Sequence, residues 1–147
     1  MGRIIIPYIN REAVVALRGK EIGGNTLQTK GVTLGLFGTD NIRAHEGDIY
    51  VCEGEFDTMY LDQQGYQCVG LPGADTFQEE WSSWFEKARR IFVVLDADEA
   101  GQRGAEKVKA ALGAKTRVEG TEGLEFEELG DDESGEDEAS DNPGTSE

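Results

Sequence analysis

The chain has 147 residues and carries 30 Asp and Glu against 14 Lys and Arg, a formal net charge of −16. This length suits one compact domain with an appendage. No apolar run approaches the roughly 18–20 residues of a membrane helix, so we expect no membrane contact. The N-terminus lacks a signal-peptide pattern, which favours the cytoplasm. Two cysteines are too few for a Cys₄ zinc site, and the single histidine argues against a His-rich metal site or a Ser-His-Asp triad.

The charge is unevenly distributed along the chain. Thirteen acids and no Lys or Arg lie from Glu119 to the C-terminus, whereas residues 1–118 hold 17 acids and 14 bases. Residues 1–30 are locally basic, with five bases and two acids. Residues 130–147 consist mainly of Asp, Glu, Ser and Gly, so we expect them to form a disordered acidic tail.

The first 48 residues predict a small antiparallel β element. Two apolar runs, Arg3–Tyr8 and Ala13–Leu17, are separated by the polar segment 9–12, which is typical of a β-hairpin. After Gly19 the segment is rich in Gly, Thr and Asn and gives no further strand signal.

The segment from residue 49 to residue 118 alternates short apolar runs with amphipathic stretches. This alternation predicts an α/β fold, a parallel sheet of about four strands flanked by helices. The expected strands are Ile49–Cys52, Gln67–Gly70, Ile91–Leu95 and Lys115–Val118. The expected helices are Asp57–Gln64, Phe77–Ala88 and Glu99–Leu112.

Acidic residues follow two of the predicted strands. Glu53 and Asp57 come after the first strand of the sheet, and Asp96 and Asp98 come directly after the strongest one. Sites in parallel sheets form at the carboxyl ends of strands, so these four acids converge if the two strands are neighbours. Close carboxylates repel one another unless a cation or a proton intervenes. The pattern therefore indicates a site for Mg²⁺ or Mn²⁺ that handles phosphate substrates. The alternative is that they are solvated acids favoured by helix N-termini.

Three segments taken together resemble the Toprim domain, a fold shared by bacterial-type primases, topoisomerases and some nucleases. They are Glu53–Asp57, Val69–Ala74 and Asp96–Gly101. The preceding stretch, with Gly2–Ile9, Val14–Lys20, Thr29-Lys30 and Leu34–Phe37, is similar to the region before Toprim in DnaG-like primases. The resemblance covers roughly residues 2–129. It divides the chain into a β-rich part of the primase core (1–48), the Toprim domain (49–129) and the tail (130–147).

The resemblance implies roles for individual residues. Glu53, Asp96 and Asp98 would be catalytic, and with Asp57 they would hold the metals that bind nucleoside triphosphates. Gly123–Leu129 looks like the next acidic segment of the family, so Glu125 and Glu127 would complete the metal site. Three cations would face the template or the nucleotide, and they are Arg18, Lys20 and Lys30.

The implied function is the Toprim-containing catalytic part of a DNA primase, which makes RNA primers on a DNA template. The chain lacks the Cys and His of a zinc-binding domain and spans only the later half of the core. A second polypeptide would therefore supply the zinc-binding and front-core regions. A bacteriophage is a plausible source, and the protein would then act in the cytoplasm of the host cell. A replicative helicase would be a further partner. Two alternatives remain: a Toprim-type metal-dependent nuclease, and a non-catalytic binding module of a replication complex.

Overall fold

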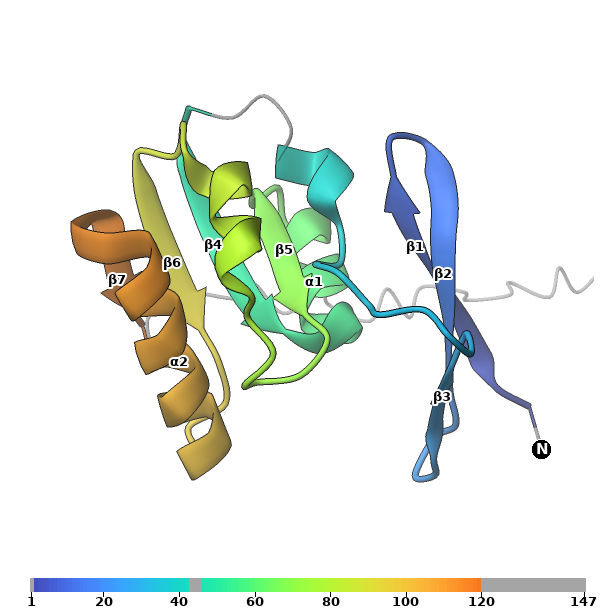
Figure 1. The fold of residues 1–147 in the computed structure, drawn as a ribbon. Helices are drawn as coiled ribbons and strands as arrows, with labels where there is room; N and C mark the ends of the chain where they lie inside the picture. The colour runs from blue at the N-terminus through green and yellow to red at the C-terminus, as the bar shows by residue number, and fades with distance from the viewer. Residues whose placement is uncertain (1, 43–45, 120–147) are drawn as a thin grey trace, which may run out of the picture.

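A computed structural model describes residues 2–42 and 46–119, whose strands form two separate sheets (Figure 1). The smaller sheet is antiparallel, in the order β1-β2-β3. Its strands are β1 (Ile4–Asn10), β2 (Ala13–Lys20) and β3 (Thr26–Gln28). The predicted hairpin is confirmed, and β3 is an addition to it. The turn between β1 and β2 holds Arg11 and Glu12 at positive φ. Its two backbone N–H groups donate to the carboxylate of Asp40 at 2.9 and 3.1 Å.

The larger sheet is parallel and has the order β5-β4-β6-β7. Its strands are β4 (Asp48–Glu53), β5 (Cys68–Leu71), β6 (Arg90–Val94) and β7 (Thr116–Val118). All four predicted strands are present within a residue or two of their expected bounds, so the predicted α/β fold is confirmed. The two strands that precede the acidic clusters, β4 and β6, are direct neighbours.

Five helical segments accompany the strands: η1 (Thr39–Ile42), α1 (Gly54–Gln63), η2 (Glu79–Phe85), α2 (Glu99–Leu112) and η3 (Gly113–Lys115). Helix α1 begins three residues before its predicted start. The helix predicted for Phe77–Ala88 is present as the shorter 3-10 helix η2, and not as an α-helix. Ser82 and Ser83 at its centre weaken an α-helix, while Phe77 and Phe85 are still fully buried. No helix in the described ranges is long and apolar enough to cross a membrane.

The two faces of the parallel sheet are covered differently. Alternate residues of β4, β5 and β6, such as Val51, Leu71 and Val93, form the main core with η2 and α2. The opposite face carries Cys52 and Cys68, two free thiols that are buried with Leu61 of α1. Figure 1 shows η2 and α2 in front of the sheet and α1 behind it.

The antiparallel sheet stands beside the edge strand β5 and turns one face toward the parallel sheet (Figure 1). That inner face buries Tyr8 and Ala16 against Leu34 and Phe37 of the connecting segment. Phe37 and Gly70 exchange two backbone hydrogen bonds of 2.9 and 3.0 Å, so the connection pairs with the edge of β5. The predicted acidic tail, residues 130–147, lies outside the described residues.

Candidate active site

The parallel pairing of β4 with β6 brings two predicted site residues together. Glu53 is the last residue of β4, and Asp96 follows β6 by two positions. The backbone N–H of Asp96 donates to Oε2 of Glu53 over 3.3 Å. The two acidic clusters that follow β4 and β6 therefore meet at the carboxyl edge of the sheet, where parallel α/β folds place their sites.

The chain turns from β4 directly into α1 without a loop. Gly54 makes this possible because its φ of 76° lies in the left-handed region, which glycine adopts at little cost. Asp57 is thereby placed in the first turn of α1, next to the end of β4. A side chain at Gly70 would overlap Thr58 and the Gly54 carbonyl, so glycine there lets α1 approach β5 closely.

The turn from β6 into α2 depends on Asp98 and Gly101. Asp98 caps α2, with its Oδ1 accepting a hydrogen bond of 2.7 Å from the N–H of Gly101. A side chain at Gly101 would overlap the backbone of Asp96. Asp98 is thus bonded within its own helix start and is not among the residues that line the cleft described next.

The acids line a cleft of about 280 Å³ between the two sheets. Its walls come from β2, the β4–α1 turn, the segment after β5 and the segment after β6. The lining residues are Lys20, Glu53, Gly54, Glu55, Phe56, Asp57, Pro72, Gly73 and Asp96. Three predicted acids and one predicted cation therefore share one cleft.

The carboxylates of the cleft influence one another's protonation. Burial raises the pKa of Glu53, and the charges of Asp96, Asp98 and Asp57 raise it further, against the lowering effect of the Asp96 N–H. Burial also raises the pKa of Asp57, as does the charge of Asp96, while Lys20 opposes the rise. Negative charge is concentrated here beyond what Lys20 neutralises.

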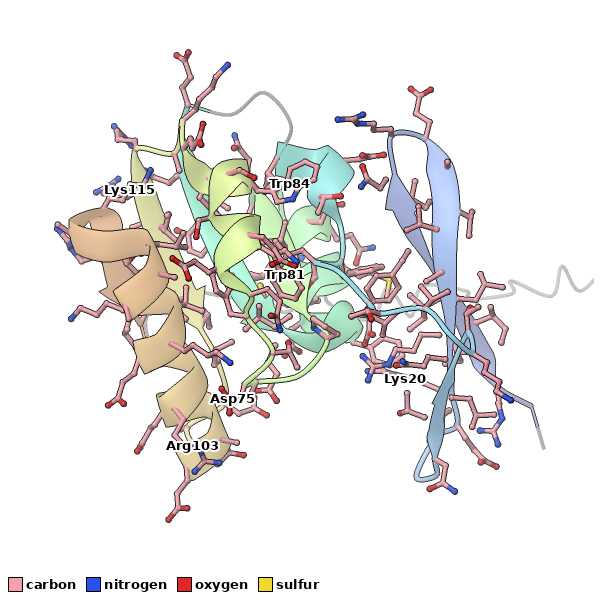
Figure 2. The ribbon with its side chains drawn as sticks, in the orientation of Figure 1. Lys20, Asp75, Trp81, Trp84, Arg103 and Lys115 are labelled. Carbon is pink, nitrogen blue, oxygen red and sulfur yellow. The ribbon has the colours of Figure 1, made fainter. Side chains whose placement is uncertain are left out.

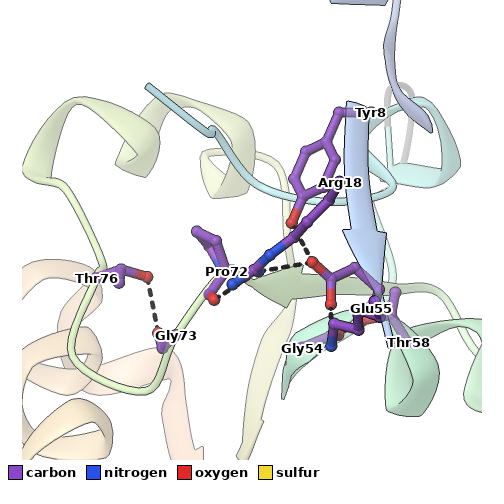
Figure 3. Close-up of polar contacts among 9 residues, drawn as sticks. Tyr8, Arg18, Gly54, Glu55, Thr58, Pro72, Gly73 and Thr76 are labelled. Carbon is purple, nitrogen blue, oxygen red and sulfur yellow. Dashed lines mark hydrogen bonds and ion pairs between the residues drawn. The ribbon is translucent and has the colours of Figure 1, made fainter. Parts of the chain in front are cut away.

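Glu55 is a site residue that the sequence analysis did not single out. It lies between Glu53 and Asp57 but is fully buried, and three side chains from the antiparallel sheet bond to its carboxylate. Figure 3 shows two of them, Tyr8 and Arg18. Oε1 accepts from the Tyr8 hydroxyl and from Arg18, each at 2.7 Å, and the Lys20 ammonium lies 2.6 Å from Oε2. Burial alone raises the pKa of Glu55, but the bonds from Lys20, Tyr8 and Arg18 hold it below its usual value.

A signal for Glu55 was present in the sequence. Arg18 and Lys20 are two positions apart on one strand and therefore share a face. Two cations on the inward face of a sheet require a buried counter-charge. Nothing in the sequence, however, marked which acid would supply it.

The three predicted cations have different surroundings. Arg18 donates to Glu55 and, over 2.8 Å, to the Pro72 carbonyl, and it lines a neighbouring groove instead of the cleft. Lys20 reaches the cleft, with its ammonium 5.0 Å from the centre of the Phe56 ring. Figure 2 shows Lys20 on the side of its sheet that faces the parallel sheet. Lys30 is exposed in the turn after β3 and lines neither space.

The donor set of the cleft suits a hard divalent cation. Glu53, Asp57 and Asp96 offer only carboxylate oxygens, which Mg²⁺ and Mn²⁺ prefer. Burial and the neighbouring carboxylates raise the pKa of Glu53 and of Asp57, and a bound cation would oppose both effects. Among the described residues, no three carboxylates, histidines or cysteines lie close enough to form a ready-made metal cluster. These residues fit an ion that keeps waters or phosphate oxygens as its remaining ligands. Glu125 and Glu127 lie outside the described residues.

The chain was compared with protein families and with curated proteins. A family model described as Toprim-like matches residues 50–127, about half of the chain. The "Gene 57 protein" of Mycobacterium phage D29 is 29% identical over 77 residues, or 52% of this chain. The match spans only 51% of that protein, so the chain corresponds to about half the length of its curated relative.

Solved structures of primases share the fold. The primase fragment of the bacteriophage T7 primase-helicase protein superposes with a TM-score of 0.67 at 27% identity, over 78% of this chain and 52% of that one. A DNA primase domain from Pseudomonas aeruginosa gives a TM-score of 0.62, also at 27% identity, over 80% of this chain and 42% of its own. The superposed part includes more than the parallel sheet and leaves about half of each primase chain unmatched.

Proposed function

Because the chain belongs to the Toprim-like family and has the fold of primase catalytic fragments, we propose that it is the Toprim-containing catalytic part of a DNA primase. It would join ribonucleotides on a DNA template as a nucleotidyltransferase. The observation that carries the proposal is the cleft in which Glu53, Asp57 and Asp96 gather opposite Lys20, in a chain with this family and fold.

Glu53, Asp57 and Asp96 would hold Mg²⁺ or Mn²⁺, with Glu125 and Glu127 as further ligands. The bound metal would neutralise phosphate oxygens and favour in-line attack by a 3′-hydroxyl. Asp98 would contribute through its charge, which acts on Glu53, and through its place at the start of α2. No covalent protein intermediate is required for this chemistry.

The cations would bind the phosphates of the nucleotide or the template. Lys20 is the best placed, because its ammonium lies at the cleft wall beside the acids. Arg18 would act as a positioning residue, since it holds both Glu55 and the backbone of Pro72 at the rim. Lys30, exposed beyond the cleft, would contact the template strand.

The proposed partners are a second polypeptide and a helicase. The chain spans 52% of the T7 primase fragment, and in this proposal a second polypeptide supplies the zinc-binding and front-core regions. The T7 protein is described as a primase-helicase, and by analogy a replicative helicase would be a further partner here.

The decisive test is primer synthesis on single-stranded DNA with ribonucleotides and Mg²⁺ or Mn²⁺. The assay combines this chain with the polypeptide that matches the unmatched part of the T7 primase fragment. We expect Asp96→Ala and Glu53→Ala each to lower the rate about 100-fold or more, since each removes a carboxylate that would hold the metal, and the metal would stabilise the transferred phosphate. The matched control is Glu99→Gln, because the Glu99 side chain is almost fully exposed and lies three residues after Asp96.

Unchanged synthesis in both alanine variants would refute the assignment. DNA cleavage by this chain alone, dependent on Mn²⁺ and abolished by the same variants, would establish the nuclease alternative instead. A wild-type chain that binds no Mn²⁺ at millimolar concentration would leave only the non-catalytic binding module.

A further inference from the structure

The antiparallel sheet has a second face, which points away from the parallel sheet and is made of apolar side chains. Residues opposite each other in the register share a face, and the alternation places Ile5, Pro7, Leu17 and Leu27 on this side with the bulged pair Val14 and Val15. We call these six residues the outer face. Apart from Pro7, which is also exposed, their exposed fractions run from 46% to 59%.

Charged groups on this side of the sheet lie at its ends, and at one end the aliphatic part of Arg3 would contact a side chain placed at Gly19. Arg18 and Lys20 of the same sheet project to the opposite side, where they meet Glu55. The nearest charges lie at the ends of the sheet, where Arg3 pairs with Glu21 over 3.2 Å and the Arg11-Glu12 turn closes the hairpin. An apolar centre with a charged rim is the composition of a protein–protein interface.

No described element covers the outer face, which Figure 1 shows on the side of β1 and β2 away from the parallel sheet. An apolar patch contiguous over three strands is larger than the scattered exposed hydrophobics of ordinary monomers. Strand β1 adds to this, because it is an edge strand whose far side has no partner in the described sheet and is open to pairing with another chain.

The chemistry of the face selects its occupant. Nucleic acid requires cations for its phosphates, and Arg3, the cation that borders the outer face, is already paired with Glu21. Residues 120–147 of this chain hold twelve acids and only three large apolar residues, Leu124, Phe126 and Leu129, which is a poor match for six apolar side chains. The relatives, in contrast, carry about half of their length beyond the matched part, and a protein segment of that size can present an apolar helix or sheet face.

We propose that the outer face is the docking surface for the polypeptide that carries the remaining part of the primase core. This inference rests on the proposed function, which requires such a polypeptide. The docked part would bury the outer face while Arg18 and Lys20, on the reverse side of the same strands, stay directed at the cleft. The docked partner would thereby lie on the face of the antiparallel sheet opposite the cleft, across β2 from the side chain of Lys20.

The test uses the polypeptide that matches the unmatched part of the T7 primase fragment and measures its Kd for this chain by isothermal titration calorimetry. We expect the double variant Val15→Glu with Leu17→Glu to raise the Kd at least 100-fold, because two charges would be buried against an apolar partner. The gentler pair Val15→Thr with Leu17→Thr keeps strand-forming residues at or beside the bulge, and we expect about a 10-fold rise. The matched control is Ile22→Glu, since Ile22 is 90% exposed in the β2–β3 turn, off the face.

Circular dichroism verifies that each variant is folded. An unchanged Kd in both double variants, or no binding of the polypeptide to the wild-type chain, overturns the proposal. Sedimentation velocity decides against it as well if the wild-type chain forms a dimer that the double variants dissociate, because a second copy is then the occupant.

The docking proposal and the proposed function fail in different ways. Asp96→Ala, which lies across the cleft, should bind the polypeptide with wild-type Kd and yet make no primer. If the wild-type complex forms through the outer face but synthesises nothing, the docking surface stands and the primase assignment fails. If synthesis occurs and is insensitive to both double variants, the primase assignment stands and the docking surface fails.

Discussion

Glu55 and Asp96 carry the same charge in opposite surroundings, and their substitutions should have opposite consequences. Glu55 is fully buried and bonded to two cations and a hydroxyl, so its charge is part of the folded structure. Asp96 is exposed after the end of β6, and its side chain makes no hydrogen bond or ion pair with any residue that the structure describes. Loss of Glu55 should act on stability, and loss of Asp96 on chemistry.

We expect Glu55→Gln to destabilise the protein by about 2–3 kcal/mol at pH 7, because Arg18 and Lys20 would lose their buried counter-charge. The measurement is urea unfolding followed by circular dichroism. Glu106→Gln, an exposed position on α2, is the matched control and should change the free energy of unfolding by less than about 0.5 kcal/mol.

The difference in unfolding free energy between the wild type and Glu55→Gln should depend on pH. Folding lowers the pKa of Glu55, so its stabilising contribution is present above the ordinary Glu pKa of about 4.3 and is lost as pH falls through the lowered value. The difference in unfolding free energy between wild type and Glu55→Gln should therefore shrink from pH 6 to pH 3. A constant difference across that range would show that the carboxylate charge is not what stabilises the site.

At the scale of elements, helix α2 packs through a glycine. A side chain at Gly104 would overlap the Ala74 carbonyl and approach Leu95, so the helix lies directly on the segment after β5. Alanine normally stabilises a helix interior by about 1 kcal/mol relative to glycine. Because Gly104 lies so close to Ala74, we expect alanine at this position to destabilise the protein instead.

We expect Gly104→Ala to destabilise the protein by about 1–3 kcal/mol through overpacking. Thermal unfolding of the variant should show a lower Tm than wild type. Gln102→Ala, an exposed position on the same helix, should leave the Tm unchanged or raise it slightly. A higher Tm for Gly104→Ala would mean that α2 is not held against Ala74.

Strands that are buried on both faces of the sheet were predicted best from the sequence. Ile91–Leu95 was recognisable because a strand covered on both faces is apolar throughout. β3 escaped prediction because all three of its residues are exposed and its pairing with β2 is what defines it. In η2 the aromatic spacing correctly indicated core contacts, but it does not distinguish a 3-10 helix from an α-helix.

The site was predictable where a general rule applied. Glu53 and Asp96 follow strands of one parallel sheet, and the sheet rule alone brings them together. Asp98 was expected beside them, yet its carboxylate caps α2. Glu55 escaped because its partners Tyr8 and Arg18 are 47 and 37 residues away in sequence, and such pairing depends on how the two sheets pack.

At the scale of the whole molecule, the net negative charge opposes nucleic-acid binding, while Lys20 in the cleft and Arg18 in the neighbouring groove favour it. Residues 120–147 hold twelve acids and no bases, so residues 1–119 carry 18 acids and 14 bases. The division of the chain at residue 48 stays a prediction, but Tyr8, Arg18 and Lys20 bond to Glu55 across it.

We expect a chain ending at Glu119 to bind single-stranded DNA several-fold more tightly than the full chain at about 50 mM salt, because less negative charge repels the phosphates. Fluorescence anisotropy over a salt series should show the difference closing as screening increases. A full-length control with the twelve acids replaced by Asn and Gln should behave like the shortened chain. Equal affinities at every salt concentration would show that these acids do not influence binding.

The cap of α2 has a consequence for how this sequence would change over time. Asp98 and Gly101 are required for the turn from β6 into α2, so selection for folding alone would preserve them. Asp96 and Asp57 are exposed, and only selection for the reaction would preserve those carboxylates. A descendant that keeps Asp98 and Gly101 but has replaced Asp96 would be a retained scaffold that no longer performs the chemistry.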